Sequence, residues 1–94
     1  MTAPKSTVVA LMWEARAVRD RGAELLEWAR AQELPVQPLR RESFKAGQDR
    51  VLVITWWHAV DAAAPLPELP EPAGDLITRP VHRWRFESVS VDLA

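Results

Sequence analysis

Two histidines, His58 and His82, are the side chains of this sequence that exchange protons near neutral pH. An imidazole can act as a general base toward an acidic phenol or enol within hydrogen-bond reach. The two could approach one cavity if the first and third strands of the chain are central in a sheet and the last strand flanks the first. Alternatively, each is a half-buried packing residue at a strand end. His58 and His82 are therefore our candidate catalytic residues.

Tryptophan is the second unusual feature, because five tryptophans stand in a sequence without Cys, Tyr or Asn. Trp56 and Trp57 are adjacent in an apolar run, and successive side chains of a strand point to opposite faces. One should therefore pack under a helix and the other face a cavity. Indoles suit a core, an interface and a ligand pocket alike, so core packing is the alternative for most of the five. The candidate ligand-binding residues are Trp56, Trp57, Arg83 and Trp84.

Charged residues alternate along the last segment, where Arg83, Arg85 and Glu87 occupy every second position. Glu14 ends an apolar run near the start of the chain. Facing charges of opposite sign could pair across neighbouring strands. They could instead line a cavity and bind an anionic ligand.

The balance of charges argues against nucleic acid as a partner. Twelve basic and thirteen acidic residues are spread along the chain and give a net charge of −1, so no basic stripe is present. No apolar run approaches the ~20 residues of a membrane-spanning helix. The start of the chain lacks the apolar core of a signal peptide, and two histidines without cysteine offer no metal site. We expect a cytoplasmic protein without membrane, nucleic-acid or metal partners.

Apolar periodicity predicts four strands and two helices in a single domain, residues 1–94. Residues 1–6 should be a flexible N-terminus. Residues 60–80 hold five prolines and should form an irregular connection. The expected elements are strands at 7–17, 39–46, 50–59 and 81–92, a helix at 23–32, turns at 46–49 and 61–64, and a second, short helix at 72–79.

The order β-α-β-β-(short α)-β predicts an α+β domain of ferredoxin-like topology, with a four-stranded antiparallel sheet and its helices on one face. Segments 7–17 and 50–59 are apolar at both odd and even positions, which is typical of strands covered on both sides. The helices can cover only one side. We therefore expect a second copy of the chain to cover the other side, as a homodimer.

Three segments carry a family resemblance: residues 21–26 (RGAELL) opening the helix, the hairpin that ends at 51–57, and a final strand after a short helical passage. In this organisation the chain resembles the dimeric α+β barrel superfamily, particularly its antibiotic-biosynthesis-monooxygenase-like branch. The resemblance implies two sheets packed face to face as a dimeric barrel. Some members oxidise aromatic polyketides without metal or flavin, which implies no cofactor. Relatives degrade haem, so haem is the one cofactor left open.

The resemblance also implies a place for a ligand. The polyketide-oxidising members have a tryptophan on the third strand, matched here by Trp56 or Trp57, and an arginine near the start of the fourth, matched by Arg79 or Arg83. The implied function is binding of a small aromatic or hydrophobic molecule, with cofactor-free monooxygenase chemistry as the activity. These members also use Asn and Tyr, which are absent here, and that absence favours the alternative of a non-catalytic dimeric module that binds or stabilises partners in a biosynthetic pathway.

Overall fold

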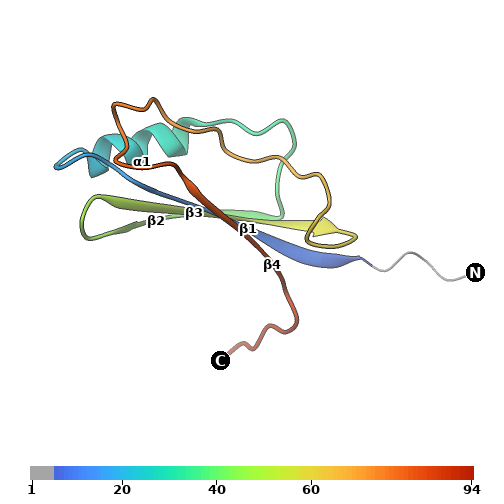
Figure 1. Ribbon diagram of the computed structural model, residues 1–94. Helices are drawn as coiled ribbons and strands as arrows, with labels where there is room; N and C mark the ends of the chain where they lie inside the picture. Colours follow the sequence, from blue (N-terminus) through green and yellow to red (C-terminus); the bar gives the residue numbers. More distant parts are fainter. Residues whose placement is uncertain (1–5) are drawn as a thin grey trace, which may run out of the picture.

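The computed structural model describes residues 6–94, which form four strands and one helix. The strands make one antiparallel sheet in the order β2-β3-β1-β4, so β1 and β3 are central (Figure 1). The protein is therefore a small α+β fold with an open sheet. The elements are β1 (Thr7–Arg16), α1 (Gly22–Ala31), β2 (Arg40–Ala46), β3 (Arg50–Ala59) and β4 (His82–Glu87).

The helix covers one face of the sheet. Odd-numbered side chains of β1 and β3 point to this face, where Trp13 and Val53 are buried together with Leu25 of α1. The ring of Trp13 also stacks on Trp28 of α1, with 6.0 Å between centroids. This alternation confirms that β1 and β3 place every second residue in a core beneath α1.

The start of α1 is fixed by the hairpin turn between β2 and β3. The Asp49 carboxylate accepts hydrogen bonds from the backbone N–H groups of Gly22 (3.2 Å) and Asp20 (3.0 Å). It thereby supplies the cap that Arg21, the residue before the helix, does not provide. A Cβ on Gly22 would lie only 2.9 Å from the Cα of Asp49, so glycine permits this close approach. The predicted turn at 46–49 therefore also positions the helix.

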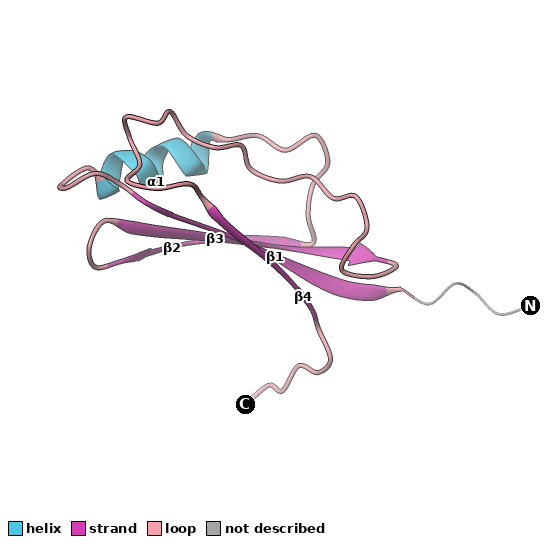
Figure 2. Cartoon of the chain, in the orientation of Figure 1, coloured by secondary structure: helices cyan, strands magenta, loops and turns pink. Residues whose placement is uncertain are grey.

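The proline-rich connection, residues 60–80, covers the same face of the sheet as α1 (Figure 2). The expected turn at 61–64 is confirmed by the hydrogen bond from Ala64 N to Asp61 O. The expected short helix at 72–79 is wrong, because Ile77 bridges Ala17 and the N–H of Thr78 donates to the carbonyl of Arg16. These backbone groups extend the pairing of β1, so they are not available to close helical turns.

Apolar side chains of this connection replace the missing helix in the core. They are buried against the sheet and α1, and they comprise Leu69, Leu76, Ile77 and Val81. Two arginines of β4 hold the connection in place: Arg83 donates to the carbonyl of Leu69, and Arg85 donates to that of Ala62. The segment therefore covers the sheet without regular structure of its own.

The last strand is shorter than the predicted 81–92. Pairing of β4 with β1 ends at Glu87 opposite Val9, followed by one hydrogen bond from Ser88 N to Val8 O. Since β1 begins at Thr7, it has no residues left to pair with positions 89–92 of the predicted strand. The other three predicted strands are confirmed to within one residue at each end.

Among residues 6–94, no helix and no connection between strands covers the opposite face of the sheet (Figure 2). Even-numbered side chains of β1 and β3 and their neighbours on β2 and β4 point to it, and Trp84 and Phe86 are 58% and 55% exposed. We call this surface the open face. Its apolar residues are Val8, Ala10, Met12, Phe44, Ala46, Leu52, Ile54, Trp56, Trp84 and Phe86.

No helix within residues 6–94 has the length and apolar character needed to cross a membrane.

Candidate functional site

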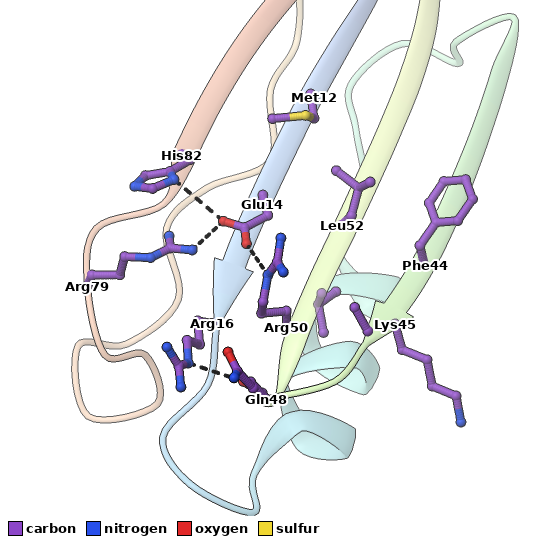
Figure 3. A pocket seen from close by; sticks show the side chains of 12 residues that line it. Met12, Glu14, Arg16, Phe44, Lys45, Gln48, Arg50, Leu52, Arg79 and His82 are labelled. Carbon is purple, nitrogen blue, oxygen red and sulfur yellow. Dashed lines mark hydrogen bonds and ion pairs between the residues drawn. The ribbon is translucent and has the colours of Figure 1, made fainter.

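A hollow of about 510 Å³ lies at one end of the open face, where β1, the β2–β3 hairpin and the residues before β4 meet. Figure 3 shows its lining side chains. Met12, Phe44 and Leu52 form its apolar wall. Its charged wall consists of Glu14, Arg16, Arg50, Arg79 and His82. We call this hollow the pocket.

Glu14 is the centre of the charged wall. Its even position on an otherwise apolar strand turns it to the open face, where it is only 8% exposed. Its Oε2 accepts a hydrogen bond from Nε of Arg50 at 3.0 Å, and its Oε1 accepts one from Nη2 of Arg79. Burial alone would raise the pKa of Glu14, but the two arginines outweigh it and hold that pKa below its ordinary value. Glu14 is therefore a buried, ionised anchor for two arginines.

His82 lies beside this anchor, because it faces Glu14 across the β1–β4 pair. Its Nδ1 is 3.6 Å from Oε1 of Glu14, which is too long for a hydrogen bond but close enough for an ion pair when the ring is protonated. With Nδ1 turned toward the carboxylate, Nε2 is the ring nitrogen left for a ligand (Figure 3). The structure thus brings one of the two candidate catalytic residues to the pocket.

His58 lies at the other end of the sheet. It pairs with Val8 of β1, whereas His82 pairs with Glu14, six positions further along the same strand. At ~3.3 Å per residue the two positions are about 20 Å apart. β1 and β3 are central and β4 flanks β1 as expected, but a single chain does not place both histidines on one cavity.

The candidate aromatic residues divide between the two faces. Trp56 lies on the open face, with the guanidinium of Arg40 5.1 Å from its ring centroid. Trp57 is buried on the helix side, where its Nε1 donates to Oγ1 of Thr55 at 2.9 Å. Trp84 shares the open face with Trp56. The sequence left open which of the adjacent tryptophans packs on the helix side, and the register places Trp57 there and Trp56 on the open face. Neither Trp56 nor Trp84 is among the residues that line the pocket.

Arg83 points to the side of the sheet that holds the proline-rich connection. It donates to the carbonyl of Leu69 at 2.7 Å and lies 3.7 Å from a carboxylate oxygen of Glu68. Arg85 pairs with the same glutamate. The expected pairing of these arginines with charges on a neighbouring strand is wrong, because both pair with Glu68 of the proline-rich connection instead. Arg83 consequently does not line the pocket, whereas Arg79 does.

Sequence reasoning missed the central role of Glu14 and the contribution of Arg50. One signal could have found them: a carboxylate within a strand that is apolar on both faces needs a cationic partner. Arg50, at the start of the strongest apolar run, is such a partner in the antiparallel register. Arg79 could not be located in this way, because it belongs to an irregular connection.

Within residues 6–94 no three His, Cys, Asp or Glu side chains gather as metal ligands would. No family model matches the chain, and no curated protein or solved structure is significantly similar to it.

Proposed function

We propose that this protein binds a small aromatic or hydrophobic molecule in the pocket, and that a second copy of the chain covers the open face. One observation carries the proposal: the apolar surface of the open face continues into the pocket, where Met12, Phe44 and Leu52 belong to both. A flat ligand placed there would have apolar contacts on one side and the Glu14–His82 wall on the other. The volume of about 510 Å³ falls in the range typical of small-molecule sites.

A second copy is the partner that this surface fits best. In a two-fold symmetric dimer, both copies contact each other through the same surface. The apolar open face of one copy can therefore be covered by the open face of the other. A chain of 94 residues also buries a modest core, and sheet-to-sheet packing would add to it. The strand order β2-β3-β1-β4 supports a ferredoxin-like assignment and the dimeric α+β barrel resemblance, although only one of the two expected helices is present among the described residues.

Sedimentation equilibrium at micromolar concentration tests the dimer. The unmodified chain should sediment as a dimer. Trp84→Glu should convert it to a monomer, because a charge would replace a large apolar side chain of the open face. Val60→Glu is the matched control, since Val60 is 70% exposed and lies outside the open face. A monomeric unmodified chain would overturn the homodimer.

Calorimetric titration with 2-naphthol tests the ligand site. Saturable binding with one site per chain is expected, and Phe44→Ala should weaken it by removing part of the apolar wall. Val36→Ala, a truncation of an exposed residue away from the pocket, should leave it unchanged. Absence of binding by the folded protein would contradict the aromatic pocket.

The Glu14–His82 pair favours one catalytic function for the same pocket. His82 Nε2 would accept the proton of a phenol or enol, and the electron pair would remain on the ligand oxygen. Arg50 and Arg79 line the same pocket, and their positive charge would favour the anion. Proton removal of this kind would begin the cofactor-free oxygenation that the family resemblance implies.

Oxygen uptake with an anthrone in air separates catalysis from binding. Uptake above the protein-free rate should be lost in His82→Ala and retained in His58→Ala, because only His82 lines the pocket. If the unmodified protein binds aromatic ligands and consumes no oxygen with anthrones, the oxygenase is excluded for these substrates. The non-catalytic dimeric module would then be the better description.

A further inference from the structure

Positive charge is concentrated at the pocket although the chain as a whole carries a net charge of −1. Three arginines, Arg16, Arg50 and Arg79, line the pocket together with a single carboxylate, that of Glu14. These four side chains together carry a surplus of two positive charges. Lys45 also contributes to the rim, but its side chain leads away from Glu14 (Figure 3) and does not enter this count.

Glu14 does not use up the donors of these arginines. Its two oxygens take one nitrogen from Arg50 and one from Arg79. Nη1 and Nη2 of Arg50 make no hydrogen bond within residues 6–94, and neither do those of Arg16, whose Nε donates to the carbonyl of Gln48. Four guanidinium nitrogens thus remain for another acceptor. Glu14 acts as a positioning residue, because it fixes the Arg50 side chain from which two of these donors extend.

A guanidinium presents its two terminal N–H groups in a plane that matches the two oxygens of a carboxylate. Opposite these donors stands the apolar wall of Met12, Phe44 and Leu52. A ligand that satisfies both walls combines a flat apolar body with one anionic end. An amine would be repelled by the surplus charge, and a neutral hydrocarbon would leave the donors unused.

We infer that the pocket is a site for an aromatic carboxylate, whose anionic end is bound by the terminal nitrogens of Arg50 with Arg16 nearby. This inference rests on the proposed aromatic pocket and adds the charge of the ligand to it. The acceptor that completes the site is then the carboxylate of the ligand, with Glu14 holding the arginine in place.

Two probes of nearly equal shape test the inference on the full chain: 2-naphthoate, which is anionic, and 2-naphthamide, which is neutral. At low salt, calorimetry should give about tenfold tighter binding of the naphthoate, since a hydrogen-bonded charge is worth at least that much. Added salt should reduce this preference and leave the naphthamide affinity unchanged.

Arg50→Gln should abolish the preference, and Arg50→Lys should retain part of it. Arg19→Gln is the control with the same loss of charge, because Arg19 is exposed and makes no ion pair or hydrogen bond within residues 6–94. Circular dichroism checks the fold of each variant. If Arg50→Gln does not fold, the role of Arg50 is tested by Arg50→Lys and by the salt dependence of the unmodified protein. The naphthoate preference should be smaller in Arg50→Lys and should fall with added salt.

The possible results separate this inference from the proposed function. Equal binding of the two probes by the unmodified protein would overturn the anion site and leave the aromatic pocket standing. Binding of neither probe would overturn the pocket itself and the inference with it. A preference for naphthoate that persists undiminished in Arg50→Gln would refute the role of Arg50.

Discussion

Glu14 and His82 face each other across β1 and β4, with Oε1 of the glutamate 3.6 Å from Nδ1 of the histidine. The same carboxylate also accepts hydrogen bonds from Arg50 of β3 and from Arg79 of the proline-rich connection. One buried carboxylate therefore joins three parts of the chain that are distant in the sequence: β1, β3 and residues 79–82 at the start of β4. The stability of this end of the sheet and the shape of the pocket should both depend on it.

Glu14→Gln should lower the free energy of unfolding at pH 7 by about 1–3 kcal/mol, the usual cost of losing hydrogen bonds to a charged group. The amide keeps the size of the side chain but cannot pair ionically with both arginines. Urea denaturation followed by tryptophan fluorescence measures the difference. Glu27→Gln, at an exposed position of α1 that makes no ion pair with any residue from 6 to 94, should stay within ~0.5 kcal/mol of the unmodified chain. An unchanged stability of Glu14→Gln would mean that its ion pairs contribute nothing.

The stabilising effect of Glu14 should also depend on pH in a defined direction. Its pKa lies below the ordinary value of 4.5, so the folded state favours the ionised form. The contribution is therefore fully present above pH 4.5 and is lost as the pH falls through the lower pKa of the folded state. The stability gap between the unmodified chain and Glu14→Gln should be constant near neutrality and should narrow below about pH 4.5. A gap that stays constant down to pH 3 would contradict this assignment.

Gly22→Ala should destabilise the protein by about 1–3 kcal/mol, as is usual when a group is forced into a packed position. The new methyl group would meet the backbone Cα of Asp49 at 2.9 Å, and a backbone atom of a tight turn cannot move aside cheaply. Gly74→Ala is the matched control, since nothing lies within 4 Å of a Cβ there. Thermal unfolding should show a lower midpoint for Gly22→Ala alone. Equal midpoints for the two variants would show that the turn accommodates the methyl group.

The central part of the fold could be predicted because its signals are local. Runs that are apolar at both odd and even positions identified β1 and β3, and a polar hairpin arm beside them identified β2. The second helix at 72–79 was wrongly predicted, because a favourable proline position says nothing of the backbone partners that Ala17 and Arg16 offer. Tertiary pairing decided that segment against its local preference.

The pocket was harder to predict than the sheet, because its residues meet only through the register. Pairing of Glu14 with His82, and the diagonal approach of Arg50, depend on which residue of each strand faces which. A shift of one residue would turn Glu14 into the core under α1. Alternation alone could say that Trp56 and Trp57 point to opposite faces, but it could not say which of them faces α1.

The hydrogen bond between Trp57 and Thr55 offers the last prediction. Both side chains are nearly fully buried on the helix side of the sheet, and Nε1 of the indole donates to Oγ1 of the threonine at 2.9 Å. Thr55→Val keeps the shape of the side chain but leaves the indole N–H without this acceptor in an apolar environment. We expect a loss of about 1–3 kcal/mol in the free energy of unfolding, the cost of a buried donor without a partner. Thr55→Ser retains the hydroxyl and loses one methyl group, so it should cost about 1 kcal/mol or less. Chemical denaturation measures the free energy of unfolding of both variants. If Thr55→Ser is less stable than Thr55→Val, packing of the methyl group matters more than the hydrogen bond.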